Sequence, residues 1–491
     1  MRGFRLFVAL VLPLLALLGG CAATRPVNPP IAEVRPDQGY RFANRNRDAQ
    51  DAETLVVLTF SGGGTRAAAF AYGVLEVLRK TEAVGPKGRR FRLLDEVDVI
   101  TGVSGGSFTA LAYGLYGERL FSEYEQRFLK RDVQGQLVTR LLSPGNWGAL
   151  SSDGWGRSEM AAQLYDEILF ENATYADLAR GSGPLIMAMG TDITTGSRVG
   201  FSQAMFDVMC SDLLAVKLSR AAATSSAVPI VMSPVTFDNY GGTCNYQPPA
   251  WTRVAADPAN PARPAARALK RLEEMQYYGD GKERPYLHLV DGGLADNLGM
   301  RTVLEVLEEF EAVRSRGMQT PLDNVKRMVV IVVNSLSVPK ANWDKSPTPP
   351  GNLDILIKAA GVPIDRYSFE SVELLRDIVA RWDLMRAVRA SPAFDAAKDP
   401  RMAQLLGAPG TQLYAIDVSF PLLQDKAEFA YLNDLPTSFV LPPEAVDRLR
   451  AAAATLLLSS PDFQRLMKDV GATIVDAPAP GAAASAPGAV R

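Results

Sequence analysis

Histidine is almost absent from this sequence, since His288 is the only one in 491 residues. A Ser-His-Asp triad could use no other histidine. His288 lies three residues before Asp291 in an apparent strand, and side chains in a strand alternate between faces with a period of two. We therefore expect the two side chains to point to opposite faces, with His288 a packed or capped residue of a sheet rather than a catalytic one.

Cysteine is also scarce, with only Cys21, Cys210 and Cys244. In an oxidising compartment Cys210 and Cys244 could form one disulfide, and two buried free thiols are the alternative. One histidine and two distant cysteines make no recognisable set of zinc ligands. We expect no metal ion and no cofactor.

Long apolar runs and a basic net charge are missing. The net charge of −2 offers no electrostatic footprint for nucleic acid. The one apolar run, Leu6–Leu18, is short for a membrane span and follows Arg2 and Arg5, as in a secretory signal. No later segment is apolar for long enough to cross a bilayer.

A lipid anchor is expected at the N-terminus, because Leu18-Gly19-Gly20-Cys21 resembles the lipoprotein cleavage box of bacteria. We predict that residues 1–20 are a signal peptide and that Cys21 is lipidated. Ala22 stands where an aspartate commonly retains lipoproteins in the inner membrane, so we expect attachment to the outer membrane, facing the periplasm. The proline-rich Arg25–Arg35 is predicted to be a spacer between this anchor and the body.

The most informative motif is Gly102–Gly106, with Ser104 at its centre. A strand-like run, Val97–Thr101, precedes it, and Ser107–Leu115 has the small and apolar residues of a buried helix. Glycines beside a serine allow the tight path of a nucleophile elbow, which presents the hydroxyl at a strand-to-helix turn. Alone, this motif also fits a structural turn.

Three consecutive glycines, Gly62, Gly63 and Gly64, follow a second strand-like run, Thr54–Phe60, and precede a helical pattern. Bare N–H groups at a helix N-terminus suit an anion. A nucleotide-binding loop would continue with Gly-Lys-Ser/Thr, whereas this chain has Thr65 and Arg66, so the pattern favours an oxyanion hole over a phosphate site.

A candidate base, Asp291, ends the strand-like run Tyr286–Val290 and precedes Gly292 and Gly293. A carboxylate at the end of a strand lies where open α/β sheets place their chemistry. The alternative is an aspartate that only caps the following helix.

Taken in order, Gly62–Arg66, Gly102–Gly106 and Asp291–Gly293 resemble the motifs of bacterial patatin-like phospholipases. Thr191–Gly196 and the small-residue block Ala221–Pro229 agree, and the resemblance covers about Leu55 to Asn334. Ala67 departs from it, because many relatives carry glycine there. The resemblance implies a three-layer α/β/α fold with a mainly parallel central sheet.

The resemblance also implies a Ser-Asp dyad, in which Ser104 attacks an acyl ester and Asp291 serves as the base. Gly62, Gly63 and Gly64 would form the oxyanion hole. Supporting roles fall to Gly102, Gly105, Gly106, Gly292, Gly293 and Arg66. Arg66 could orient the glycine loop, neutralise a phosphate head group, or be an ordinary structural or surface charge.

The expected function is that of a lipid acyl hydrolase acting on phospholipids or other acyl-ester lipids. A non-catalytic envelope lipoprotein that uses the fold for interaction is one alternative, and a serine thioesterase or peptidase is another.

Apolar strands alternating with helices independently favour a mainly parallel sheet covered on both faces. The expected strands are Thr54–Phe60, Val97–Thr101, Leu185–Met189, Tyr286–Val290, Arg327–Val333 and Gln412–Val418. We predict a lipidated linker over 21–50, a catalytic domain over 51–335, a mostly helical extension packed on it over 336–475, and a disordered Ala/Pro tail over 476–491.

The stretch Leu137–Arg157 contains Leu141, Leu142, Trp147 and Trp155 among glycines and serines. It fits a lid or a lipid-facing loop. Packing of these side chains into the core is the slightly favoured alternative.

Overall fold

The computed structural model describes residues 25–45, 50–84, 90–152, 154–249, 251–253, 266–314, 318–338, 343–392 and 410–475. The predicted signal peptide, Cys21 and the predicted tail over 476–491 lie outside these residues. For them the sequence-based expectations stay predictions.

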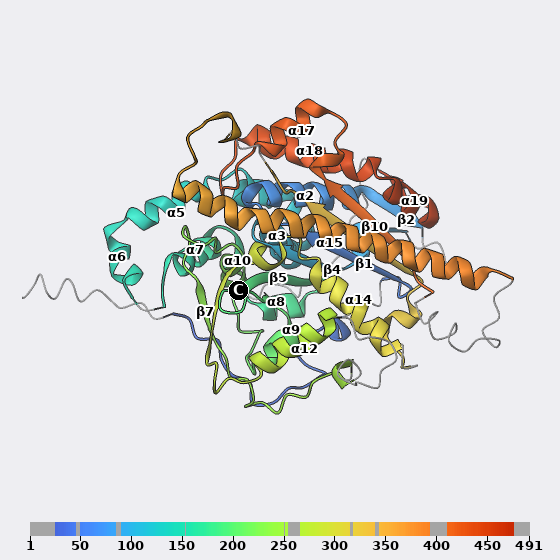
Figure 1. The fold of residues 1–491 in the computed structure, drawn as a ribbon, viewed down its shortest axis with the longest axis horizontal. Helices are drawn as coiled ribbons and strands as arrows, with labels where there is room; N and C mark the ends of the chain where they lie inside the picture. Colours follow the sequence, from blue (N-terminus) through green and yellow to red (C-terminus); the bar gives the residue numbers. More distant parts are fainter. Residues whose placement is uncertain are drawn as a thin grey trace, which may run out of the picture.

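Within the described residues, a central eight-stranded sheet has the order β10-β9-β1-β4-β5-β8-β7, with β6 paired to β5 (Figure 1). All six strands expected from the sequence are present in it. A smaller sheet has the order β11-β2-β3. The strands are β1 (Thr54–Phe60), β2 (Thr81–Val84), β3 (Arg90–Arg92), β4 (Val97–Val103), β5 (Leu185–Asp192), β6 (Arg198–Gly200), β7 (Val235–Asp238), β8 (Tyr286–Asp291), β9 (Arg327–Asn334), β10 (Gln412–Ser419) and β11 (Thr473–Ile474).

Helices cover both faces of the central sheet, as Figure 1 shows. They are α2 (Gly64–Lys80), α3 (Gly105–Tyr116), α4 (Leu120–Tyr124), α5 (Val133–Leu142), α6 (Pro144–Leu150), α7 (Arg157–Tyr165), α8 (Tyr175–Arg180), α9 (Gln203–Val208), α10 (Leu218–Ser225), α12 (Ala266–Tyr278), α13 (Gly293–Asp296), α14 (Arg301–Arg314), α15 (Asn352–Ala390), α17 (Lys426–Asn433), α18 (Pro443–Ser459) and α19 (Pro461–Val470).

The alternation of side chains along the parallel strands divides the apolar core in two. In β1, Leu58 and Phe60 join the cluster that contains residues of α2, α3 and α18. Val57 instead joins Leu304 of α14 and Trp382 of α15 on the opposite face. Because each central strand buries both faces, its sequence is continuously apolar. The fold is therefore the expected three-layer α/β/α arrangement.

Strand β8 departs from the parallel pattern. The pairs β10-β9, β9-β1, β1-β4 and β4-β5 are parallel, whereas β8 runs antiparallel to β5. It overlaps only the last three residues of β5, where Asp291 pairs with Gly190. Asp291 thus reaches the carboxyl ends of β4 and β5 from the opposite direction, an exception within the mainly parallel sheet that the sequence predicts.

The segment 25–45 packs along the body, so the prediction of a spacer over Arg25–Arg35 is wrong. Arg25 donates two hydrogen bonds to the Asp238 carboxylate, at 2.5 and 2.6 Å. The amide of Asn28 donates to Ser211 Oγ at 2.7 Å. Pro30 forms a β-bridge with Ser211, and its hydrogen bonds come from the flanking residues, Ile31 N–H to the Cys210 carbonyl and Asp212 N–H to the Pro29 carbonyl, because proline has no N–H.

A disulfide joins Cys210 and Cys244, whose Cα atoms are 5.4 Å apart. Both residues are fully buried. The backbone N–H of Ile31 donates to the Cys210 carbonyl at 2.9 Å, and that of Val34 donates to the Cys244 carbonyl at 3.3 Å. The disulfide therefore supports the surface on which the N-terminal segment lies.

Candidate active site

Ser104 occupies a sharp turn between β4 and α3. Its φ of 47° and ψ of −121° define a backbone conformation that residues other than glycine rarely adopt. Such a conformation costs about 1–3 kcal/mol. Its N–H donates to Ser225 Oγ at 2.8 Å, and its carbonyl accepts from Ser107 Oγ at 2.6 Å. These hydrogen bonds hold the serine in the strained conformation of a nucleophile elbow.

The glycines around Ser104 are required by close approach of other backbone segments. A Cβ atom on Gly105 would lie 1.9 Å from the Gly64 carbonyl oxygen, and one on Gly106 would lie 2.6 Å from that of Ser61. On Gly102 it would meet the Cα of Ser107 at 2.7 Å. The absence of side chains therefore brings the serine turn directly against the glycine loop.

Asp291 and Ser104 meet at the carboxyl edge of the sheet. The Ser104 hydroxyl lies close enough to the Asp291 carboxylate to lower its pKa, and both residues are buried, 4% and 7% exposed respectively. Burial raises the pKa of Asp291 to about 6, while the hydrogen bond from the Gly293 N–H and the nearby Ser104 hydroxyl oppose the rise. A carboxyl group with this pKa is half ionised at mildly acidic pH and ionised at neutral pH.

Gly292 and Gly293 fix the turn that follows Asp291. The Gly293 N–H donates to Asp291 Oδ1 at 2.7 Å. A Cβ on Gly292 would lie 2.3 Å from the Met189 carbonyl oxygen. Thr191 Oγ1 donates to the Asp291 carbonyl at 2.9 Å, so neighbouring strand β5 also holds the aspartate in place.

The glycine loop lies beside Ser104, but its three N–H groups are not equivalent. The Gly62 N–H donates to the Asn297 carbonyl at 2.9 Å, so the prediction that it contributes to an oxyanion hole is wrong in this arrangement. Within the described part of the chain, the N–H groups of Gly63 and Gly64 have no acceptor. Gly63 has φ 140° and Gly64 has φ 59°, conformations that favour glycine.

One further N–H group at the elbow was missed in the sequence analysis. Gly105 follows Ser104 and begins α3, and its N–H has no acceptor among the residues described. The residue after the nucleophile supplies an oxyanion donor in other serine hydrolases with such an elbow. The motif spacing alone could have suggested this group.

A C-terminal segment, Leu435–Ser438, also borders the site, and nothing in the sequence pattern indicates it. The Thr65 N–H donates to the Ser438 carbonyl at 2.8 Å. A Cβ on Gly64 would lie 2.3 Å from that same carbonyl oxygen. The glycine loop is therefore packed between the serine turn and a segment far along the chain.

Arg66 connects these parts from a buried position, with 3% of its surface exposed. Its guanidinium donates to the carbonyls of Ser335 and Leu435, at 2.9 and 2.6 Å, and to Thr437 Oγ1 at 3.1 Å. Burial lowers its pKa to about 10. Of the alternatives left open by the sequence, this geometry supports orientation of the loop and contradicts a surface charge.

We expect Arg66→Met to lower kcat about 10- to 100-fold with a smaller change in KM, because the loop loses its bonds to Ser335 and Leu435 and two buried carbonyls lose a donor. Steady-state kinetics on a soluble ester, with circular dichroism to verify folding, measures this effect. Arg376→Met is the matched control, since that arginine is half-exposed on α15. A folded Arg66→Met protein with the kcat of the wild type would contradict the positioning role.

His288 lies away from Asp291. It is exposed, and β8 buries Leu287 and Leu289 on the other face. Its Nδ1 lies 3.0 Å from Thr236 Oγ1 on β7. The alternation of β8 thus separates the histidine from the carboxylate.

The predicted lid region, Leu137–Arg157, contains both buried and exposed apolar side chains. Trp155 is buried, as core packing predicts, and Leu141 is half-buried. Leu142 is 68% exposed and Trp147 is 57% exposed, so the expectation of core packing is wrong for these two. They lie at the end of α5 and within α6, which carry few buried side chains.

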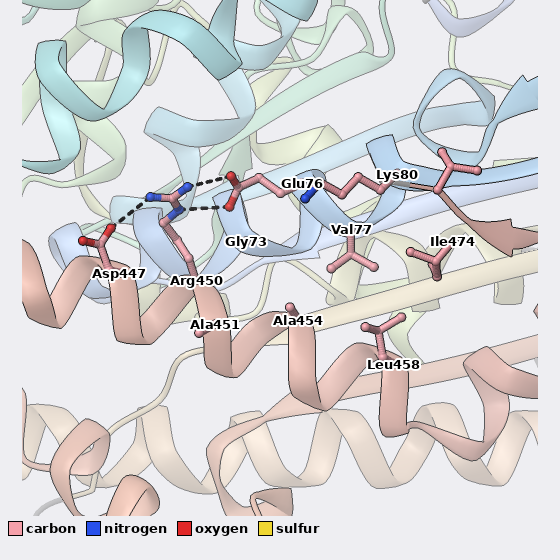
Figure 2. Close-up of a pocket in the computed structure, with 11 residues that line it drawn as sticks. Gly73, Glu76, Val77, Lys80, Asp447, Arg450, Ala451, Ala454, Leu458 and Ile474 are labelled. Atoms are coloured by element: carbon pink, nitrogen blue, oxygen red, sulfur yellow. Dashed lines mark hydrogen bonds and ion pairs between the residues drawn. The ribbon is translucent and has the colours of Figure 1, made fainter. Parts of the chain in front are cut away.

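A pocket elsewhere in the described residues lies apart from the candidate site. Among the described residues, no cluster of three or more His, Cys, Asp or Glu side chains could hold a metal ion, and no helix has the length and apolarity to cross a membrane. A cavity of about 490 Å³ lies between α2 and α18 (Figure 2). It contains the ion pair of Arg450 with Glu76 and none of the candidate site residues.

Comparison with solved structures finds distant similarity. Human GIVD cytosolic phospholipase A2 aligns with a TM-score of 0.38 and 14% identity, covering 88% of this chain and 62% of that one. The same enzyme in complex with methyl gamma-linolenyl fluorophosphonate aligns with a TM-score of 0.39 and 14% identity, covering 85% and 58%. VipD from Legionella pneumophila aligns with a TM-score of 0.28 and 11% identity, covering 94% and 74%.

The chain thus spans less than two thirds of the human enzyme's length in these alignments. No curated protein matches the sequence. The family model for patatin-like phospholipases matches residues 58–304, which is just over half of the 491 residues and includes the serine turn, the glycine loop after Phe60 and Asp291. The chain belongs to the patatin-like phospholipase family.

Proposed function

We propose that this protein is a serine lipid acyl hydrolase that cleaves acyl esters of phospholipids through Ser104 and Asp291. Membership of the patatin-like phospholipase family supports lipid acyl hydrolysis. The observation that carries the assignment of residues is the close approach of the Ser104 hydroxyl, at the strained turn, to a buried carboxylate with a raised pKa. The N–H groups of Gly63, Gly64 and Gly105 beside the serine add to this support.

In the proposed first half-reaction, Ser104 Oγ attacks the ester carbonyl carbon while Asp291 takes its proton. The negative oxygen of the tetrahedral intermediate accepts hydrogen bonds from the free N–H groups of Gly63, Gly64 and Gly105. Loss of one such donor typically costs about 100-fold or more in rate. The intermediate then collapses to an acyl-serine, and Asp291 returns the proton to the departing alcohol.

In the proposed second half-reaction, water attacks the acyl-serine and Asp291 takes a proton from that water. The second tetrahedral intermediate expels Ser104 Oγ, which regains a proton from Asp291, and the fatty acid leaves. The lipid ester, one water molecule and the side chains of Ser104 and Asp291 account for every atom in these steps. The products are one fatty acid and one lysophospholipid or other alcohol.

A panel of phospholipid, lysophospholipid, acyl-CoA and peptide substrates tests this proposal. We expect turnover of the lipid esters and little turnover of peptide. Preferred cleavage of acyl-CoA or peptide would support a thioesterase or peptidase instead. No turnover of any of the four by the folded protein would support a non-catalytic envelope lipoprotein.

The pH dependence of kcat/KM should follow the ionisation of Asp291. Because the base acts in its ionised form and its pKa is raised to about 6, activity should rise with pH and reach half of its plateau near pH 6. Rates of soluble-ester hydrolysis from pH 4 to 9 measure this midpoint. A midpoint near 4, the ordinary value for aspartate, would show that burial does not tune the base.

We also propose that the protein is anchored by lipid at Cys21 to the periplasmic face of the outer membrane. Cys21→Ser is expected to block lipid attachment and to leave an unprocessed or mislocalised precursor. Mass spectrometry of the mature N-terminus with membrane fractionation measures both effects. An unmodified Cys21 in a soluble periplasmic protein would identify an ordinary signal peptide instead.

A further inference from the structure

An exposed apolar loop, Val228–Met232, begins at the candidate active site. The carbonyl of Ala227, just before it, accepts from the Asp291 N–H at 2.9 Å. The carbonyl of Ser225 accepts from the Gly292 N–H at 3.1 Å, and Ser225 Oγ accepts from the Ser104 N–H. The position of this loop is therefore tied to both the serine and the aspartate.

The loop presents branched side chains to solvent. Val228 is 39% exposed, Ile230 is 56% exposed and Val231 is 64% exposed. Ile230 has φ 74°, a left-handed conformation that branched residues rarely adopt. A polar residue or glycine would suit such a solvent-facing turn better, so the apolar side chains indicate a contact with something outside the chain.

Two more exposed apolar side chains, Leu142 and Trp147, lie in α5 and α6, and α7 packs against both α5 and α10, the helix before the loop. Figure 1 shows α5 and α6 extending to the left of the body, beyond α7 and α10. The first turn of α7, which follows α6, contacts the residue just after the loop, since the Ser158 N–H donates to Ser233 Oγ at 3.1 Å. We call Leu142, Trp147, Val228, Ile230 and Val231 the apolar rim.

The N-terminal segment also reaches this end. Arg25, the first residue described, packs against Gly154, where a Cβ atom would lie 2.8 Å from its side chain. The ion pair with Asp238 fixes it there, 2.5 Å from the carboxylate. Three residues separate Arg25 from Cys21, and a chain of this length spans at most about 14 Å between the two Cα atoms.

We infer that the apolar rim rests on a phospholipid bilayer and orients the candidate active site toward its lipid substrate. This inference depends on the proposed function for the substrate class and commits to a lipid surface as the occupant. Tryptophan is suited to the boundary between head groups and acyl chains, and isolated aliphatic side chains insert beside it. The fixed exit of the N-terminal segment would hold the rim against the membrane.

Two double variants of the full chain, Ile230→Ser with Val231→Ser and Leu142→Ser with Trp147→Ser, test this contact. Each variant is attached through its N-terminal lipid anchor to vesicles of phosphatidylethanolamine and phosphatidylglycerol. Because the wild type and all variants carry the same anchor, they differ only in the substituted side chains. We expect phospholipid hydrolysis in vesicles to fall about tenfold and hydrolysis of a soluble short-chain ester to stay within about twofold of the wild type. Leu458→Ser with Ile474→Ser is the matched control, because both residues are exposed in the remote cavity of Figure 2.

Fluorescence gives a second readout that needs no catalysis. Brominated lipids should quench part of the tryptophan fluorescence of the vesicle-bound protein, and Trp147→Phe should remove most of that quenching. If the wild type hydrolyses neither substrate, the proposed function fails, while this quenching still decides the location of the rim.

Wild-type rates on vesicles in both rim variants would overturn the inference, as expected if the rim binds a protein partner or a second copy of the chain. Equal losses on vesicles and on the soluble ester would also overturn it, because they would indicate damage to the site. Quenching that does not depend on Trp147 would place the rim away from the bilayer.

Discussion

Replacement of Ser104 by alanine is expected to lower kcat for ester hydrolysis by at least about four orders of magnitude, as loss of the nucleophile does in other serine hydrolases. The substitution removes a hydroxyl that lies beside the Asp291 carboxylate. The backbone hydrogen bonds of the turn, to Ser225 and from Ser107, do not involve this hydroxyl. Folding should therefore persist, which circular dichroism and a thermal unfolding curve can verify.

Ser219→Ala is the matched control for this experiment. Ser219 is also fully buried, and within the described residues its hydroxyl has no hydrogen-bond partner. Its replacement should leave turnover near that of the wild type. Full activity in a folded Ser104→Ala protein would remove Ser104 from the mechanism.

The second large effect is expected at Asp291. Asp291→Asn should lower kcat about 10³- to 10⁴-fold, because the amide cannot take the proton of Ser104. His288→Gln should retain most activity, since His288 is exposed and contacts Thr236 on β7. Parallel kinetics on the two folded variants gives the ranking, and the reverse order would require a mechanism based on histidine.

The Asp291 substitution should also stabilise the protein at neutral pH. The folded pKa, about 6, lies above the ordinary value of 3.8, so ionisation of this buried carboxyl disfavours the folded state. The penalty is absent below the unfolded pKa, grows as pH rises between the two values, and is constant above the folded pKa. We expect Asp291→Asn to raise the free energy of unfolding by on the order of 2–3 kcal/mol at pH 8 and by little at pH 3, as urea unfolding can measure.

Much of the site could be predicted from local sequence because its parts are short turns. Ser104 follows an apolar strand, and glycines flank it where other backbone segments approach within contact distance. The same reasoning located the glycine loop at the start of α2. The apolar run before Asp291 predicts the strand that ends there, whereas the antiparallel pairing of β8 with β5, which brings the aspartate beside Ser104, has no local signal in the sequence.

The remaining features depend on contacts between distant segments, which a single sequence does not encode in any local pattern. The three consecutive glycines predict three N–H donors for an oxyanion hole. The Gly62 N–H instead donates to the carbonyl of Asn297, which is far along the chain. Arg66 reaches Leu435 and Thr437 in a region outside the family match. The proline content of the segment after Arg25 predicts a spacer, because its partners, Asp238 and Ser211, are too distant in sequence to leave a local pattern.

Ser104 should be the residue that becomes covalently modified during catalysis, and labelling with a fluorophosphonate followed by peptide mass spectrometry tests this directly. The serine oxygen displaces fluoride from phosphorus, so a reactive nucleophile gains the mass of the phosphonyl group. We expect the added mass on Ser104 in the wild type, much slower labelling in Asp291→Asn, and none in Ser104→Ala. Labelling of another serine would contradict the proposed mechanism. So would a loss of ester hydrolysis on treatment with the fluorophosphonate while Ser104 stays unmodified.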